Sequence, residues 1–186
     1  MTIDLVMILI ILMYMIIGFR RGLWLNSLHL SSTLVSLFIA HRFYQYISKQ
    51  MIVFVPFPKT VAFDTHFAFQ YHDVQQRFDT IVAFLCIAFI SKLLLYLIIV
   101  TFDNIVSYHN IHVTSRILGS VLGSIASVIV LQLVLYLVSL YPNEWIQESL
   151  KYGYLSHIIL FKMPFLSSYI PVSYTHLRAH ETGRNL

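Results

Sequence analysis

Gly18-Phe19-Arg20-Arg21-Gly22 joins two apolar stretches near the beginning of this chain. The first stretch covers residues 3–19 and the second covers residues 23–40, so no long loop separates them. Each stretch approaches the roughly 20 apolar residues that a helix needs to cross a hydrocarbon core about 30 Å thick. The sequence therefore predicts a hairpin of two membrane-crossing helices.

The remainder of the chain has the same apolar character. Hydrophobic residues make up 58% and charged residues 11% of the sequence, whereas a soluble domain carries about 25% charged residues. We therefore predict an all-α integral membrane protein, with the lipid bilayer as its partner and one membrane domain over residues 1–171. Its four transmembrane helices are expected at residues 3–19, 23–40, 80–102 and 117–140. The net charge of +4 is scattered, which excludes a nucleic-acid surface built from clustered lysine and arginine.

The charges beside the first stretch predict an uncleaved anchor. A signal peptide has basic residues before its apolar run, whereas here the acidic Asp4 lies at the start of the run and Arg20 and Arg21 follow it. Together with Arg116, just before the last stretch, these arginines favour cytoplasmic short loops and outside termini. A bare count of lysine and arginine over the longer second loop and the tail favours the opposite orientation.

The second stretch carries a polar stripe of Asn26, His29, Thr33 and Ser36. Steps of three and four residues place these side chains on one face of a helix. Such groups commonly form hydrogen bonds between membrane helices that are worth about 0.6 kcal/mol each. We expect the stripe to face other helices. The alternative is that these side chains line a polar path within the membrane.

Lys92 lies close to the middle of the third stretch. A lysine at the bilayer centre costs about 2.5–3.5 kcal/mol on insertion scales, and an intramembrane charge is a functional-site hypothesis. Apart from Asp4 at the outer end of the first crossing, no other predicted crossing contains an acidic residue. Gln132 and the polar stripe are therefore the candidate partners of the ammonium group. A hydrogen-bond hub, a snorkelling side chain and a transport-related charge are the three readings.

The fourth stretch has small residues at four-residue steps, Gly119, Gly123 and Ser127. This pattern allows two helix backbones to approach closely. We expect these positions, with Gly18 and Gly22, to be helix-packing sites. The fourth helix has three candidate partners: another helix of the same chain, a second copy of the chain in a homo-oligomer, or another membrane protein.

Two segments outside these stretches are predicted to lie at the membrane interface. Residues 41–79 contain Pro56 and Pro58 among many aromatic residues, which favours an amphipathic or re-entrant element in the second loop. Residues 143–171 are read as a short helical C-terminal tail, because their apolar runs are too short for a fifth crossing.

The final residues 172–186 are set aside as a non-native tail. Residues 172–182, VSYTHLRAHET, resemble the in-frame translation of a transposase-type sequencing adapter. Such segments are excluded from fold reasoning. No function is therefore sought in His176 or His180.

No residue is assigned a catalytic, cofactor-binding or metal-binding role. Ser27 and His29 are too close along one helix to act as nucleophile and base, and no Gly-x-Ser-x-Gly is present. His66 and His72 are not at helical ligand spacing. We therefore predict a protein that is not an enzyme and needs no cofactor.

Three motifs together resemble one family of bacterial membrane proteins. They are Ile3-Asp4-Leu5, Gly18-Phe19-Arg20-Arg21-Gly22-Leu23 and Arg116-Ile117-Leu118-Gly119-Ser120-Val121-Leu122-Gly123. On these residues the chain resembles the colicin V production protein family, and Pro56-Phe57-Pro58 with the aromatic second loop is similar to Gram-positive members. The resemblance implies a multi-pass protein of the cytoplasmic (inner) membrane that supports toxin production or export, or envelope homeostasis, without known catalytic residues.

A second functional hypothesis rests on the polar membrane residues. A subunit of a small channel or transporter would use Lys92 and the polar face of the second helix. The sequence leaves this reading beside that of a non-enzymatic supporting protein.

Overall fold

The computed structural model describes residues 2–65, 67–69, 73–106 and 112–162. Within these ranges all regular structure is helical: α1 (Thr2–Phe54), α2 (Lys59–Asp64), α3 (Val74–Val106), α4 (Val113–Leu140), α5 (Glu144–Lys151) and α6 (Tyr154–Phe161). Three helical segments are long and apolar enough to cross a membrane, namely Thr2–Ser48, Val74–Thr101 and Val113–Leu140. The predictions of an all-α architecture and of a membrane protein are confirmed.

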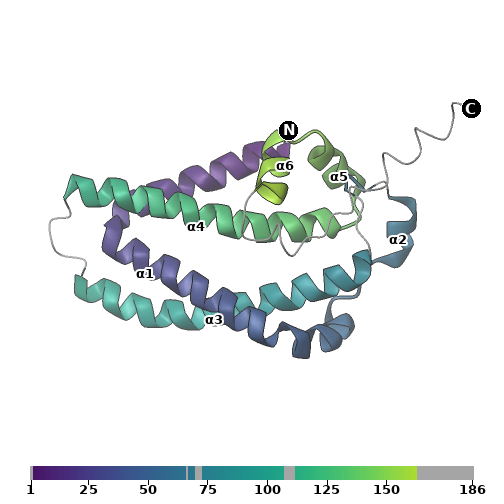
Figure 1. The fold of residues 1–186 in the computed structure, drawn as a ribbon, viewed down its shortest axis with the longest axis horizontal. Helices are drawn as coiled ribbons and strands as arrows, with labels where there is room; N and C mark the ends of the chain where they lie inside the picture. The colour runs from purple at the N-terminus through teal and green to yellow at the C-terminus, as the bar shows by residue number, and fades with distance from the viewer. Residues whose placement is uncertain (1, 66, 70–72, 107–111, 163–186) are drawn as a thin grey trace, which may run out of the picture.

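Helix α1 is bent back on itself. Gly22 has φ 76° and ψ 179°, a combination that is essentially confined to glycine because it brings a Cβ into steric conflict. Figure 1 shows the ribbon of α1 reversing direction, so that its two parts run back along the molecule. We call residues 2–21 the first arm and residues 23–54 the second arm. Together they form the hairpin that the pentapeptide predicts.

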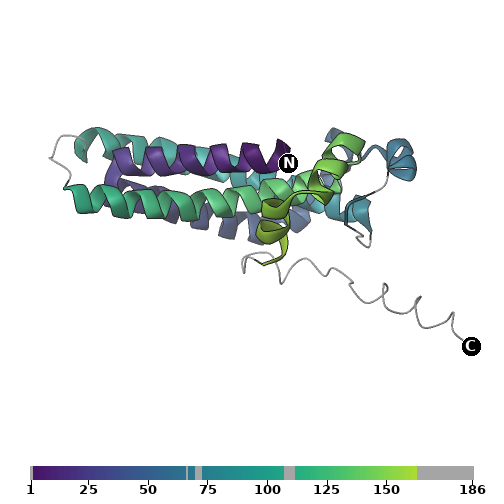
Figure 2. The same ribbon diagram turned by 90° about the horizontal axis from the view of Figure 1, so that it is seen from above.

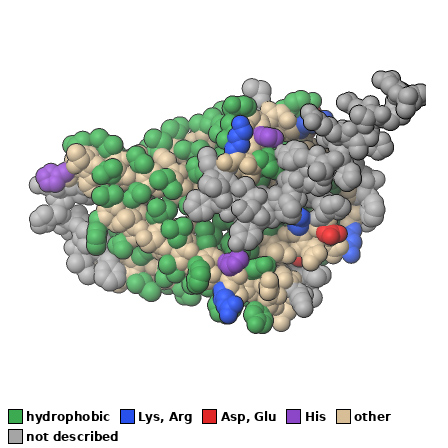
Figure 3. All heavy atoms as spheres, in the orientation of Figure 1, with side chains coloured by type: hydrophobic (Ala, Val, Ile, Leu, Met, Phe, Trp, Pro, Cys, Tyr) green, Lys and Arg blue, Asp and Glu red, His purple; other side chains and the backbone are tan. Residues whose placement is uncertain are grey.

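The two arms, α3 and α4 lie side by side along the long axis of the molecule, as Figures 1 and 2 both show. The turn of α1, the end of α3 and the start of α4 share one end, which we call the arginine end. The N-terminus, α2, α5 and α6 gather at the opposite end, which we call the tail end. On the face drawn in Figure 3, hydrophobic side chains cover the long helices, and visible Lys, Arg, Asp and Glu side chains lie in its central and right-hand parts.

Several predicted helices are shorter than the helices in the structure. The second arm continues to Phe54 where the sequence predicts an end at residue 40, and α3 begins at Val74 where the prediction has residue 80. Likewise α3 ends at Val106 and α4 begins at Val113, so the predicted ranges 80–102 and 117–140 both lie inside longer helices. The predicted second loop, residues 41–79, is therefore partly occupied by the ends of α1 and α3 and by α2, and its position at the membrane interface stays a prediction. The apolar pattern reports the lipid-facing part, whereas the helix continues until Pro56 and Pro58 interrupt it.

Helices α1 and α4 approach so closely that their backbones touch at four glycines. A Cβ atom placed on Gly119 would lie 2.7 Å from the Gly22 carbonyl carbon, and one on Gly18 would lie 3.0 Å from the Gly119 carbonyl carbon. A Cβ atom on Gly123 would lie 3.2 Å from the carbonyl carbon of Tyr14. We call these four glycines the glycine seam. In this seam Gly119 and Gly123 of α4 pack against α1 of the same chain.

Ser127 continues the α4 side of this seam. It is completely buried, and its hydroxyl donates to the Ser124 carbonyl oxygen of its own helix at 2.7 Å. A small side chain whose polar atom is satisfied locally can lie against a neighbouring helix without requiring a partner there.

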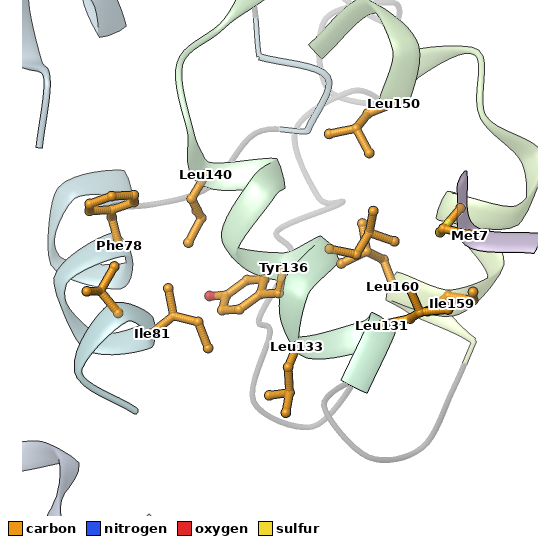
Figure 4. Close-up of a cluster of buried hydrophobic side chains, with 12 residues drawn as sticks. Met7, Phe78, Ile81, Leu131, Leu133, Tyr136, Leu140, Leu150, Ile159 and Leu160 are labelled. Carbon is orange, nitrogen blue, oxygen red and sulfur yellow. The ribbon is translucent and has the colours of Figure 1, made fainter. Parts of the chain in front are cut away.

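The short helices of the tail end pack onto the bundle through a shared core. Met7 of the first arm, Leu131 of α4 and Leu160 of α6 belong to one buried cluster, which Figure 4 shows together with Phe78 of α3. Helices α5 and α6 have eight residues each, and are therefore far too short to cross a bilayer. The described part of the predicted C-terminal tail is thus a pair of short helices.

Two side chains connect the tail helices to distant segments. The Asp4 carboxylate accepts from the backbone N–H groups of Tyr154 at 3.0 Å and Ser156 at 3.2 Å, so it caps the first turn of α6 as an N-terminal carboxylate does. The Gln147 amide donates to the carbonyl oxygens of Ser139 and Tyr141 at the end of α4. Its own carbonyl oxygen accepts from a backbone N–H in the second loop at 2.9 Å.

The glycine seam can be tested by whether Gly119→Ala raises or lowers the free energy of unfolding. On an exposed helix surface, replacing glycine by alanine stabilises by about 1 kcal/mol. At Gly119 the added methyl would meet the backbone of α1, so we expect a loss of about 1–3 kcal/mol, as for other overpacked sites. The measurement is the free energy of unfolding in mixed micelles, with the lipid-facing Val121→Ile as control. A stabilised Gly119→Ala protein would contradict the seam.

Candidate functional site: the polar cluster around Lys92

The Lys92 ammonium group donates three hydrogen bonds, all to the second arm of α1. Its Nζ lies 2.7 Å from the His29 carbonyl oxygen and 2.8 Å from Thr33 Oγ1, and it also donates to Ser32 Oγ. A lysine ammonium has three N–H donors and no acceptor. The second arm therefore provides one acceptor for each of the three N–H donors of Lys92.

The acceptors are themselves held in place by the helix that carries them. The hydroxyls of Ser32 and Thr33 each donate to the His29 carbonyl oxygen at 2.9 Å. Each hydroxyl proton is thus directed at the backbone, which leaves the oxygen lone pairs available to the ammonium. One helical turn of α1 presents three oxygens to a single point on α3. We call Lys92, His29, Ser32 and Thr33 the lysine cluster.

The lysine cluster lies deep within the long helices. His29 and Thr33 follow Gly22 by 7 and 11 residues in the second arm, which corresponds to about 10–17 Å along a helix axis. The hydrocarbon core is about 30 Å thick, so this distance brings the cluster close to mid-depth when the turn lies at the membrane surface. Hydrogen-bonded oxygens replace water around the charge, which lowers the free-energy penalty of burying it.

The other residues of the predicted stripe have different partners. Asn26 is buried and its Nδ2 donates to the Gly119 carbonyl oxygen at 2.7 Å, which joins the second arm to α4. Ser36 is buried and donates to the Thr33 carbonyl oxygen of its own helix. Gln132 is completely buried on α4 and is not among the three acceptors of Lys92. The stripe is therefore divided between α3 and α4.

Two details of the cluster differ from what spacing alone suggests. His29 contributes its carbonyl oxygen to Lys92, and its ring lies against Tyr96 with the centroids 5.8 Å apart. Ser32 is absent from the predicted stripe although it is an acceptor. Ser32 is three residues after His29 and Thr33 is four residues after it. Both steps place a side chain on the same face of a helix, so the sequence spacing also indicates Ser32 as a member of this face.

The three arginines proposed as topology signals lie near the turn of α1 and the start of α4. Arg116 has its guanidinium carbon 5.9 Å from the centre of the Phe19 ring, within the range of a cation–π contact. Ser115 Oγ accepts from the Leu23 backbone N–H at 3.0 Å. Across the described ranges, no three His, Cys, Asp or Glu side chains come together in a way that could hold a metal ion.

The geometry of the lysine cluster is that of an internal clamp. The charge is on α3, its acceptors are on α1, and Asn26 of the same arm contacts α4. The second arm therefore has polar connections to both other long helices. Hydrogen bonds between membrane helices are individually modest, at about 0.6 kcal/mol on average, but bonds to a charged group are stronger, at about 1.5–3 kcal/mol.

A double-mutant cycle measures this clamp. We expect Ser32→Ala with Thr33→Val to destabilise the protein by about 1–3 kcal/mol, because two acceptors of a buried ammonium are lost. The same pair of substitutions made on a Lys92→Met background should have a much smaller effect, since no charge then needs the oxygens. Ser31→Ala on the exposed side of the arm is the control. Equal losses on both backgrounds would show that the hydroxyls do not serve Lys92.

Comparison with known proteins agrees with this membrane architecture. The family model described as "Colicin V production protein" matches residues 3–163. The chain is also 24% identical over 176 residues to the "Uncharacterized transmembrane protein YshB" of Bacillus subtilis (strain 168), in an alignment that covers 95% of this chain and 99% of that protein. No solved structure matches. The chain belongs to the colicin V production protein family.

Proposed function

We propose that the chain crosses the membrane four times, because each arm of α1 forms its own crossing. An unbroken helix of the 53 residues of α1 would be about 80 Å long, far beyond the thickness of a bilayer. The reversal at Gly22 divides it into a first arm of about 30 Å and a longer second arm. With α3 and α4, this gives four crossings of comparable depth.

We further propose a cytoplasmic-membrane protein with its arginine end in the cytoplasm. The proposal is supported by the position of Arg20, Arg21 and Arg116 at helix ends next to short connections, where the positive-inside rule applies most strongly. Both the N-terminus and the tail helices then face the outside. Residue 171, which we also expect outside, lies beyond the described residues.

The function best supported is a non-enzymatic one, in toxin production or export or in envelope homeostasis. The observation that carries it is the lysine cluster, in which the membrane charge directs all three of its N–H groups at the protein's own helix. A charge used in this way holds helices together and is not presented to a substrate. The family's description as colicin V production protein supports the choice of process.

A transport role is the second candidate. One observation favours it: the three acceptors of Lys92 are neutral oxygens, and none is a carboxylate. A positive charge without a negative partner near mid-depth could attract an anion that enters the bundle. The two candidates differ in what happens when the charge is removed and the fold is kept.

Lys92→Met separates the two candidates in a bacterial strain that lacks the native protein. If Lys92 is a structural clamp, the variant should be folded, abundant in the membrane and able to restore envelope integrity, because methionine fills the site without a buried charge. If Lys92 acts in transport, the variant should be folded but inactive. Detergent sensitivity and membrane abundance are the readouts, and Lys151→Met at the exposed tail end is the control. A folded Lys92→Met protein without function would replace the structural proposal by transport.

A further inference from the structure

The arginine end gathers positive charge from two parts of the chain that are distant in sequence. Arg20 and Arg21 end the first arm, and Arg116 lies in the first turn of α4. The hydrogen bond between the Leu23 N–H and Ser115 Oγ, at 3.0 Å, joins these two segments. The guanidinium of Arg116 also lies over the ring of Phe19, the residue that precedes Arg20 in the first arm.

Among the side chains that the structure describes, no carboxylate forms an ion pair with these arginines. Arg20 and Arg116 are exposed and Arg21 is half-buried, so their N–H groups are available to a ligand. A guanidinium group offers a planar fork of donors that fits the oxygens of a phosphate group. Three such groups at one end of the molecule favour an anionic ligand rich in oxygen.

Exposed apolar side chains lie close to these arginines in sequence. Trp24 and Ile117 are 64% and 53% exposed, and Phe19 and Leu118 are also exposed. Aromatic rings are favoured at headgroup depth, and aliphatic side chains are favoured against acyl chains. A soluble phosphate would make no use of these neighbours, whereas a phospholipid contacts both the arginines and the apolar groups.

We propose that the arginine end is a binding surface for an anionic phospholipid. Its phosphate is held by Arg20, Arg21 and Arg116, and its acyl chains lie along exposed Ile117 and Leu118 of α4. Basic pockets between transmembrane helices recognise anionic headgroups by this combination of charge and depth. The inference uses the proposed four-crossing topology only to place the arginines at headgroup depth. It assigns these residues a ligand in addition to any influence on orientation.

The test is thermal unfolding of the purified full chain in detergent with added phosphatidylglycerol or phosphatidylcholine. We expect phosphatidylglycerol to raise the unfolding temperature of the wild-type protein more than phosphatidylcholine does. Arg20→Gln with Arg116→Gln should remove at least half of this difference. Lys59→Gln with Lys151→Gln, which removes the same charge from exposed positions at the tail end, should leave it intact. An equal loss in both pairs, or no preference in the wild type, would overturn the proposal.

Two further measurements on wild-type protein keep the test independent of variant folding. Raising the salt concentration should weaken the preference for phosphatidylglycerol, because exposed charges are screened; a preference that salt does not change would overturn the role of the arginines. Inorganic phosphate at the same concentration should give little stabilisation. A full effect of inorganic phosphate would show that the surface takes a free anion. These readouts do not involve envelope function, so they fail or succeed separately from the proposed cellular role.

Discussion

Direct contact between the backbones of α1 and α4 determines the arrangement of the other helices. Lipid removes the hydrophobic driving force between membrane helices, so their association depends on close packing and on hydrogen bonds. Gly18, Gly22, Gly119 and Gly123 provide the contact because none of them has a side chain. This contact places the Asn26 amide at the Gly119 carbonyl oxygen. It also brings the arginines of two separate segments to one surface.

A second constraint is that polar groups inside the bundle need partners within the protein. At the membrane level, one turn of α1 provides every acceptor of Lys92. At the tail end, Gln147 and Asp4 do the same for backbone groups at helix ends, which would otherwise lack partners. The chain therefore uses long-range side-chain contacts where lipid or limited water cannot supply hydrogen bonds. This is a structural reason for polar residues in a sequence with so few charges.

The sequence predicts the features that depend on residues close together in the chain. Charge, helical periodicity and small-residue spacing single out Lys92, the polar stripe and the glycines; the structure joins Lys92 to His29 and Thr33 of the stripe and packs the glycines of α1 against those of α4. Ser32 also lies on the face that contains His29, but the steps from residue 26 to 29, 33 and 36 pass over it. The roles of Asp4 and of the Gln147 side-chain carbonyl oxygen could not be predicted, since their partners are 150 and 79 residues away in sequence. The helix beyond residue 40 was missed because composition reports the lipid environment and does not report where a helix ends.

The claim on which this account depends most is that α1 crosses the membrane twice, with its reversal at Gly22. Single cysteines at Thr2, Lys59 and His112, each in a Cys86→Ala background, test it with an impermeant thiol reagent in intact cells. Thr2 and Lys59 flank α1 at the tail end, and His112 precedes α4 at the arginine end. We predict that positions 2 and 59 are labelled and that position 112 is labelled only after the membrane is permeabilised. Labelling of positions 2 and 59 on opposite sides would show that α1 crosses once and would contradict the account.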